Sequence, residues 1–219
     1  MRFNRNFLAH LNGLCHRLMK YSRLWYYRRK SKQLVNDGFS LFCNNCTGGV
    51  ILHDLGQRFN TPTVNLSLSV SDFTEFVSDL RGYLLPDVQE ERRLNAAYPI
   101  GRIEHGDKAI FLNFVHYKTF EEGRAKWNER KGRVFWDNIF ILVESPEISE
   151  NDMERLSVLE YPVAVLGPVN EDLGRRYNFY HGFKWYQGWY AGKSIDYKSR
   201  LGLTKFLDDF DYISFLNKQ

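Results

Sequence analysis

The fold is decided by residues 38–57, which read GFSLFCNNCTGGVILHDLGQ. The first six residues form a short apolar run typical of a buried strand, and the last ten, from Gly48 onward, have the apolar spacing of a short helix. Two cysteines and two asparagines, Cys43 to Cys46, stand where the apolar run ends and before the helical pattern begins. A strand that passes through a tight polar turn into a helix is the repeating unit of α/β folds.

The same alternation continues outward along the chain. We predict further strands at residues 63–69, 98–104, 108–115, 138–144 and 162–167, and helices at residues 71–84, 120–133 and 149–159. The turn at residues 105–107 would pair two of these strands as a hairpin, and Ser71 or Asp72 would cap the first helix. Together these elements predict an α/β fold, with a parallel or mixed sheet and helices on both faces.

The C-terminal part follows this pattern less clearly. After Pro168 the sequence becomes rich in aromatic residues and glycines, and it ends with a predicted helix near residues 204–216. This aromatic segment fits a flap over the sheet edge or a platform for sugars. We therefore expect residues 37–219 to form a single α/β domain with an aromatic C-terminal segment.

Residues 1–36 form a basic N-terminal arm. Nine of the 30 Lys and Arg residues lie in it without any acidic residue, which leaves 21 basic against 26 acidic residues in the rest of the chain. Phe3, Phe7, Leu11, Leu14 and Leu18 recur at helical spacing, so an appended amphipathic helix is predicted over about the first 25 residues.

Cationic residues and aromatics flank this apolar stripe, as in helices that lie on anionic membranes, and we expect residues 1–32 to bind such a surface. Packing against the domain or against a second copy in a homo-oligomer is an equal alternative. Nucleic acid is not an expected partner, because the rest of the chain is acidic and shows no recognition motif.

The three cysteines are too few for a disulfide framework, and the sequence shows no secretory signal and no run long enough to span a membrane. A cytoplasmic protein, peripheral on the inner face of the cell membrane, is therefore expected.

The turn after the first strand allows four interpretations. A structural zinc site is disfavoured, because beyond Cys43 and Cys46 only Cys15 remains as a thiolate ligand, and no metal is predicted. A Cys-x-x-Cys pair between strand and helix also fits a redox dithiol. The other two interpretations are a nucleophilic Cys46 and a tight structural turn with buried cysteines.

The nucleophile hypothesis assigns a role to several neighbours. The positive end of the helix is expected to lower the pKa of Cys46, and the turn with Asn44, Asn45, Gly48 and Gly49 would bind an oxyanion or a phosphate. His53 is too far along the helix to act as base. His116 is the better candidate if strands 38–43 and 108–115 run parallel, because both residues then follow carboxyl ends of strands. A structural histidine is its alternative role.

A cationic stripe is predicted on the helix at residues 120–133. Lys126, Arg130 and Arg133 are spaced to share one face beside Trp127, which would suit a polyanionic ligand such as a pyrophosphate or coenzyme A. The alternative is a solvated face whose charges are balanced by Glu122 and Glu129.

Several of these motifs, in this order, resemble a bacterial family described as exopolysaccharide or capsular polysaccharide biosynthesis proteins. The stretches are CNNCTGG, FNTPTVNLSLSVSDFTEFVSDLRGYL, YPIG, FVHYKTFEEGRAKWNERKGRV and DNIFIL. The matching positions are Asn44, Asn45, Cys46, Gly48, Gly49, Asn60, Pro62, His116, Tyr117, Lys126, Trp127 and Arg130. The resemblance implies a biosynthetic setting and gives these positions, Tyr117 included, as candidates for a site.

These observations together favour a transferase that builds or modifies a cell-surface polysaccharide. The favoured reaction is acyl transfer to a glycan or lipid-linked saccharide, with Cys46 as nucleophile and His116 as base. The donor would be acyl-coenzyme A, with no tightly bound cofactor. The alternatives are a glycosyltransferase that uses a nucleotide sugar, for which DDFD at residues 208–211 comes close to an Asp-x-Asp metal motif, and a non-catalytic adaptor at the membrane surface.

Overall fold

The computed structural model describes residues 19–188, 190–199 and 202–218. The strands are β1 (Ser40–Cys43), β2 (Gln89–Glu91), β3 (Ile100–His105), β4 (Lys108–Asn113), β5 (Ile139–Glu144), β6 (Val163–Pro168) and β7 (Tyr180–Phe183). The helices are α2 (Cys46–Asp54), α3 (Val70–Ser78), α4 (Leu80–Leu84), α5 (Phe120–Lys131), α6 (Glu150–Ser157), α7 (Glu171–Arg176) and α8 (Tyr212–Leu216), with short 3-10 helices η1 (Lys184–Tyr186), η2 (Lys193–Ile195) and η3 (Phe206–Asp209). Residues 19–31 are helical too, whereas most of the predicted amphipathic helix lies outside the described residues.

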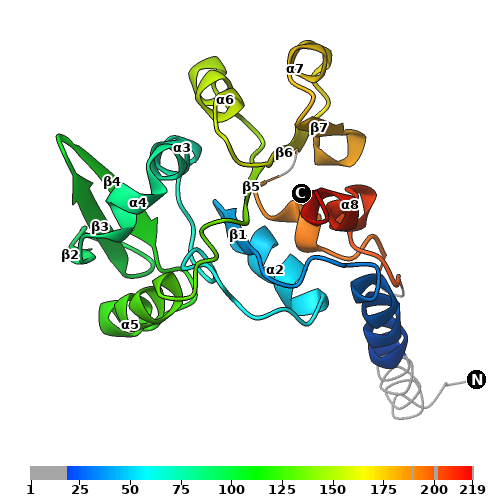
Figure 1. The fold of residues 1–219 in the computed structure, drawn as a ribbon, viewed down its shortest axis with the longest axis horizontal. Coiled ribbons are helices and arrows are strands. Elements are labelled where there is room, and N and C mark those ends of the chain that lie inside the picture. The colour runs from blue at the N-terminus through cyan, green and yellow to red at the C-terminus, as the bar shows by residue number, and fades with distance from the viewer. Residues whose placement is uncertain (1–18, 189, 200–201, 219) are drawn as a thin grey trace, which may run out of the picture.

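A four-stranded parallel sheet forms the centre of the fold. Its strand order is β1-β5-β6-β7, and every neighbouring pair is parallel. Side chains alternate between the two faces, so that Leu41 and Cys43 of β1 pack with α2 and α8, while Phe42 packs with α3 on the other face. Figure 1 shows α2 and α8 on the side away from α3 and α6. The predicted α/β architecture with helices on both faces is confirmed.

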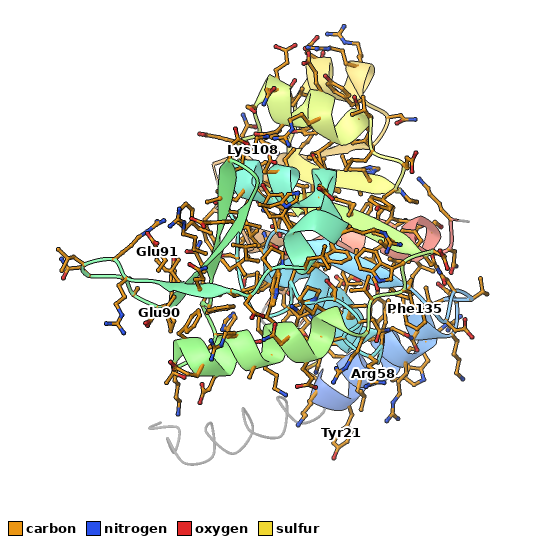
Figure 2. All side chains as sticks on the ribbon, turned by 60° about the vertical axis from the view of Figure 1, so that its left-hand side comes forward. Tyr21, Arg58, Glu90, Glu91, Lys108 and Phe135 are labelled. Atoms are coloured by element: carbon orange, nitrogen blue, oxygen red, sulfur yellow. The ribbon has the colours of Figure 1, made fainter. Side chains whose placement is uncertain are left out.

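A second sheet lies between β1 and β5 in the sequence. It is antiparallel, with the order β2-β3-β4, and β3 and β4 form the predicted hairpin through residues 106–107. Figure 2 shows it standing out to one side, with Glu90 and Glu91 on β2 and Lys108 on β4. One face packs into the main core through apolar residues such as Ile103 and Leu112. Residues 37–219, predicted to form one domain, therefore contain two sheets.

The strand predicted at residues 63–69 is wrong. Asn65 has a φ of 67°, in the left-handed region, which interrupts the extended backbone that the alternating sequence predicts. The segment bonds to two different sheets: the Leu68 amide donates to the Asn44 carbonyl at 2.8 Å, and Ser67 forms an isolated bridge with Asn113 of β4. It is a connection between the sheets and not a strand of either one.

The helix predicted at residues 71–84 is divided in two. It begins earlier, because Ser69 and not Ser71 or Asp72 is the N-cap of α3 and accepts a hydrogen bond from the Asp72 amide. Asp79 leaves the helical conformation, with φ −146° and ψ 69°, and caps α4 by accepting from the Gly82 amide at 2.9 Å. A second N-cap inside an apolar periodic segment therefore ends one helix and starts the next.

The aromatic C-terminal segment contributes a strand as well as a cover. Tyr180–Phe183 forms β7 at the edge of the parallel sheet, which the sequence analysis did not predict. The chain then continues through η1 and η2 to η3 and α8. Leu207 of η3, Phe215 of α8 and Phe210 between them pack on the sheet face also covered by α2. Within the described residues, no helix has both the length and the apolar character required to cross a membrane.

Glu75 of α3 joins three elements, and its replacement tests how they are held together. Burial acts to raise the pKa of Glu75, but hydrogen bonds from Lys108 of β4, Arg155 of α6 and Tyr83 outweigh it, so that the pKa lies below its ordinary value. The stabilisation is therefore complete above the ordinary glutamate pKa of about 4.3 and is lost as the pH falls through the lower folded-state pKa.

We predict that Glu75→Gln lowers the free energy of unfolding by about 1–2 kcal/mol at pH 7, and that its difference from the wild type shrinks below about pH 4. Urea denaturation of both proteins at pH 7 and at pH 3 measures this difference in stability. Glu154→Gln, at an exposed position on α6, is the matched control and should change stability little. An equal loss at pH 7 and pH 3 would contradict the ionic explanation.

Candidate active site

The turn between β1 and α2 is fixed by its two asparagines. The Asn44 side chain accepts from the Glu144 amide at 2.9 Å and donates to the Glu144 carbonyl at 3.1 Å, which continues the pairing of β1 with β5 beyond the strands. Asn45 is the N-cap of α2 and accepts from the Thr47 amide at 2.9 Å. Cys46 is thereby held as the first residue of α2, at the carboxyl edge of the parallel sheet.

The structure brings Cys46 and His116 together. His116 Nε2 lies 3.1 Å from Cys46 Sγ, within hydrogen-bonding distance, although the two residues are 70 positions apart in the sequence. The reason predicted for this meeting is wrong, because β4, which precedes His116, belongs to the antiparallel sheet. The contact instead depends on the segment at residues 67–68, which bonds to Asn44 beside Cys46 and to Asn113 near His116.

A buried carboxylate that the sequence analysis did not identify lies beside this pair. Glu144 is the last residue of β5 and is completely buried. It accepts hydrogen bonds from the Thr47 hydroxyl and the Asn45 side-chain amide, and from the backbone amides of Gly192 at 3.1 Å and Ser194 at 3.3 Å. The carboxylate therefore joins the start of α2 to the aromatic C-terminal segment. The available sequence signal was an acidic residue at the end of an otherwise apolar strand.

Burial decides the proton affinity of both thiols. It raises the pKa of Cys46, and the Glu144 carboxylate raises it further, which is opposite to the direction predicted from the helix N-terminus. Burial raises the pKa of Cys43 to about 12, although the amides of Asn45 and Gly48 donate toward its sulfur. Both cysteines are free thiols. At neutral pH Cys43 is an inert core residue, which disfavours the redox interpretation, and Cys46 requires a base to react.

The two glycines of the turn serve packing. A Cβ on Gly48 would lie 2.5 Å from the Cys43 Cβ, and one on Gly49 would lie 3.2 Å from Val64 Cγ1. The Gly48 amide is directed at the Cys43 sulfur, so this one amide of the turn is already engaged. Their small size lets α2 pack closely against β1 and the connecting segment.

Tyr117 and Arg130 act together on the connecting segment. Arg130 is 8% exposed and donates from Nη1 to the Val64 carbonyl and to the Tyr117 hydroxyl, both at 2.9 Å. The Tyr117 hydroxyl also lies 3.4 Å from the Val64 carbonyl. These bonds fix the loop that carries His116 against the segment beneath α2. Arg130 is thus an internal positioning residue, and the partly buried Tyr117 helps it to hold the loop.

The predicted cationic stripe is not assembled. Trp127 is 1% exposed and packs against Phe76 in the main core, away from any surface stripe. Lys126 pairs with Glu129 at 2.6 Å, and Arg133 pairs with the same carboxylate. Hydrogen bonding to Lys126 accordingly lowers the pKa of Glu129. Since Arg130 is used internally and Lys126 and Arg133 share the Glu129 carboxylate, the three cations do not form one free surface stripe.

The other candidate ligands of the sequence are also engaged elsewhere. His53 is exposed on α2 beside Asp54, and Asp208 of the DDFD cluster accepts from Lys30 at 2.7 Å and from Tyr27 at 3.0 Å. In the part of the chain that the structure describes, no group of three or more His, Cys, Asp or Glu side chains is placed to hold a metal ion.

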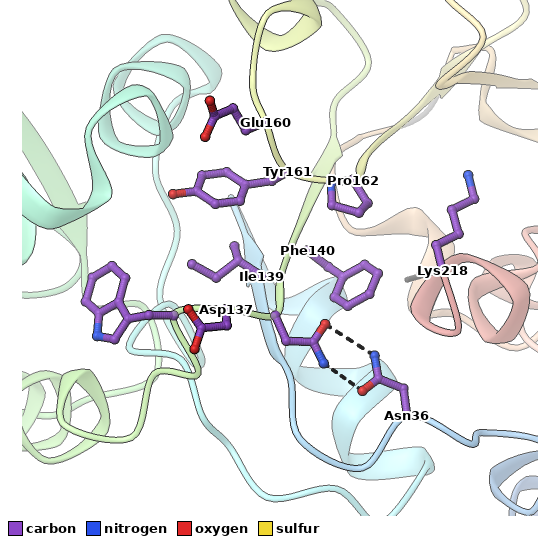
Figure 3. A pocket seen from close by; sticks show the side chains of 10 residues that line it. Asn36, Asp137, Ile139, Phe140, Glu160, Tyr161, Pro162 and Lys218 are labelled. Atoms are coloured by element: carbon purple, nitrogen blue, oxygen red, sulfur yellow. Dashed lines mark hydrogen bonds between the residues drawn. The ribbon is translucent and has the colours of Figure 1, made fainter.

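A cavity of about 670 Å³ opens at the other edge of the parallel sheet, where β5 and β6 begin. Figure 3 shows its polar lining, in which Asn36 and Asn138 bond to each other through their side-chain amides. The same two amides also donate to the carbonyls of Leu216 and Gly38. They hold the chain segments that enter the sheet, and Cys46 lies at the opposite edge.

Comparison with known proteins places nearly the whole chain in one family. The model of the family described as "Domain of unknown function (DUF1919)" matches residues 18–217. An "Uncharacterized protein" of Haemophilus influenzae is 30% identical over 203 residues, which cover 90% of this chain and 93% of the relative. Neither description names a reaction or a substrate. Every residue of the site described above lies within the matched span.

Close packing at the turn predicts a cost for any side chain at position 48. We expect Gly48→Ala to lower the free energy of unfolding by about 1–3 kcal/mol, because its Cβ would overlap the Cys43 side chain unless α2 moves. Gly174→Ala, in α7 with open space around it, is the control and should be neutral or slightly stabilising. Thermal unfolding of the two variants measures both effects, and equal stability would contradict the packing role.

The raised pKa of Cys46 predicts slow alkylation at neutral pH. We expect the rate of iodoacetamide modification at Cys46 to rise with a midpoint above about pH 8.5, the ordinary cysteine value, because the thiol keeps its proton to a higher pH. Peptide mapping by mass spectrometry measures the rate at this residue, with glutathione as the reference thiol. A midpoint below pH 7 would show a preformed thiolate and imidazolium pair instead.

Proposed function

The chain belongs to the DUF1919 family, and we propose that it is a transferase of cell-surface polysaccharide synthesis that uses Cys46 as nucleophile and His116 as general base. The observation that carries this proposal is the 3.1 Å contact between His116 Nε2 and Cys46 Sγ. A nucleophile and a base within hydrogen-bonding distance are the minimal apparatus of covalent catalysis. The polysaccharide setting is supported by the motifs that resemble exopolysaccharide biosynthesis proteins, which include both residues.

The first half of the reaction transfers the acyl group to the protein. His116 Nε2 accepts the Cys46 proton while Sγ attacks the carbonyl carbon of an acyl-coenzyme A thioester. The bond from this carbon to the coenzyme A sulfur breaks, and the departing thiolate takes the proton from His116. The products are a Cys46 thioester and free coenzyme A, so that atoms and protons balance.

The second half transfers the group to the acceptor. A hydroxyl of a glycan or lipid-linked saccharide attacks the Cys46 thioester, and His116 accepts the hydroxyl proton. The carbon–sulfur bond breaks, an ester forms, and the proton returns to Cys46. Tyr117 and Arg130 contribute by fixing the loop of His116 against the Val64 carbonyl, which keeps the base aligned without touching the substrate.

The decisive experiment is intact-protein mass spectrometry after incubation with acyl-coenzyme A thioesters of several chain lengths. We predict an added acyl mass that maps to Cys46, is absent in Cys46→Ala, and forms about 100-fold more slowly in His116→Gln. Cys43 remains in both variants as an internal control thiol.

The other outcomes separate the alternatives. Acylation of Cys43 or Cys15 without acylation of Cys46, or no adduct with any thioester, would overturn the mechanism with Cys46 as nucleophile. Turnover of a nucleotide sugar without an adduct would identify a glycosyltransferase. If neither donor reacts and Cys46→Ala preserves polysaccharide synthesis in cells, the protein is a non-catalytic adaptor.

A further inference from the structure

The helix at residues 19–31 is fixed to the domain by one face. Tyr27 and Lys30 both bind the Asp208 carboxylate of η3, at 3.0 and 2.7 Å, and Arg23 donates from Nε to the Gly202 carbonyl at 2.9 Å. Arg23 also lies 3.7 Å from the centre of the Tyr197 ring. These inward contacts determine which face of the helix points away from the domain.

The outward face carries large apolar side chains. Tyr21 is 70% exposed, Leu24 45% and Trp25 61%, and their spacing of three and four residues places them on one stripe of the helix. Figure 2 shows Tyr21 pointing away from the domain. Large aromatic residues with a polar edge are enriched where a protein meets the interface of a bilayer. Two such aromatic residues beside an exposed leucine mark an interaction surface.

The same outward face is cationic. Four exposed basic residues flank or interrupt the apolar stripe: Lys20, Arg28, Arg29 and Lys32. The first acidic residue of the sequence is Asp37, so no carboxylate of this segment balances them. In contrast to Lys126 and Arg133 of α5, these cations have the charge complementarity expected for an anionic surface.

We propose that the outward stripe of residues 20–32, with Tyr21, Leu24 and Trp25 at its centre, lies on an anionic lipid bilayer. The apolar side chains enter the boundary between headgroups and acyl chains, while the arginines contact lipid phosphates. In the sequence, Leu14 and Leu18 precede Tyr21 and Trp25 at the same spacing of three and four residues. This inference is independent of the reaction at Cys46 and would stand if that reaction were disproved.

Vesicle co-sedimentation of the full chain tests the proposal. The wild type is expected to bind phosphatidylcholine vesicles that contain phosphatidylglycerol, and to bind pure phosphatidylcholine vesicles much less. Tyr21→Ser with Trp25→Ser should reduce binding at least tenfold, and Arg28→Ser with Arg29→Ser should reduce it roughly fivefold for each arginine removed. Circular dichroism and thermal unfolding check that the variants remain folded, as expected because their inward contacts are unchanged.

Two controls make the result specific to this surface. Leu94→Ser removes a 97% exposed apolar residue from the loop between β2 and β3, and Arg92→Ser removes an exposed cation nearby; neither should alter vesicle binding. Wild-type binding in the double serine variants, or no binding to anionic vesicles at low salt, would overturn the proposal. A dimer in solution that Trp25→Ser dissociates would also overturn it, by showing that a second copy occupies this face.

Discussion

The structure depends on two asparagine side chains that replace main-chain pairing where the parallel sheet ends. Beyond Cys43 the chain must leave β1 while its amides and carbonyls remain partly buried, and an unpaired buried polar group is costly. Asn44 bonds to both main-chain groups of Glu144, and Asn45 caps α2. The Asn44 carbonyl then accepts from Leu68. One polar turn thereby sets the end of β1, the start of α2 and the position of the connecting segment.

This constraint explains how an inserted sheet completes the site. The residues between β1 and β5 contain the antiparallel sheet and α5; Cys46 lies at the start of this segment, and His116 lies between β4 and α5. They meet through main-chain bonds at Ser67 and through the Arg130 contact with the Val64 carbonyl. Main-chain bonds and buried guanidinium contacts are rigid, so the exposed His116 is carried on a well-supported loop.

The sequence predicted those features that depend on local periodicity. The buried strands 138–144 and 162–167, the hairpin at 105–107 and the helix at 120–133 were found because a few neighbouring residues suffice to define them. The strand predicted at residues 63–69 was wrong because apolar and polar residues also alternate in a half-buried connecting segment. The left-handed conformation of Asn65 leaves no mark on the pattern of apolar residues. Cys46 and His116 were selected by their chemistry, but the pairing of sheets that unites them is a long-range property. Glu144 was missed for the same reason, since its partners come from two distant segments.

Burial of Cys46 has a consequence for the proposed chemistry that geometry alone does not reveal. A thiol whose pKa is raised is protonated at rest, so it resists oxidation and adventitious alkylation. The intrinsic nucleophilicity of a thiolate increases with its pKa, and the thiolate released from such a site is therefore a strong nucleophile. The limiting step becomes removal of the proton, for which His116 lies at 3.1 Å. In the proposed reaction, attack and proton transfer must then occur together when an acyl donor is present, which confines the reactivity of Cys46 to the bound substrate.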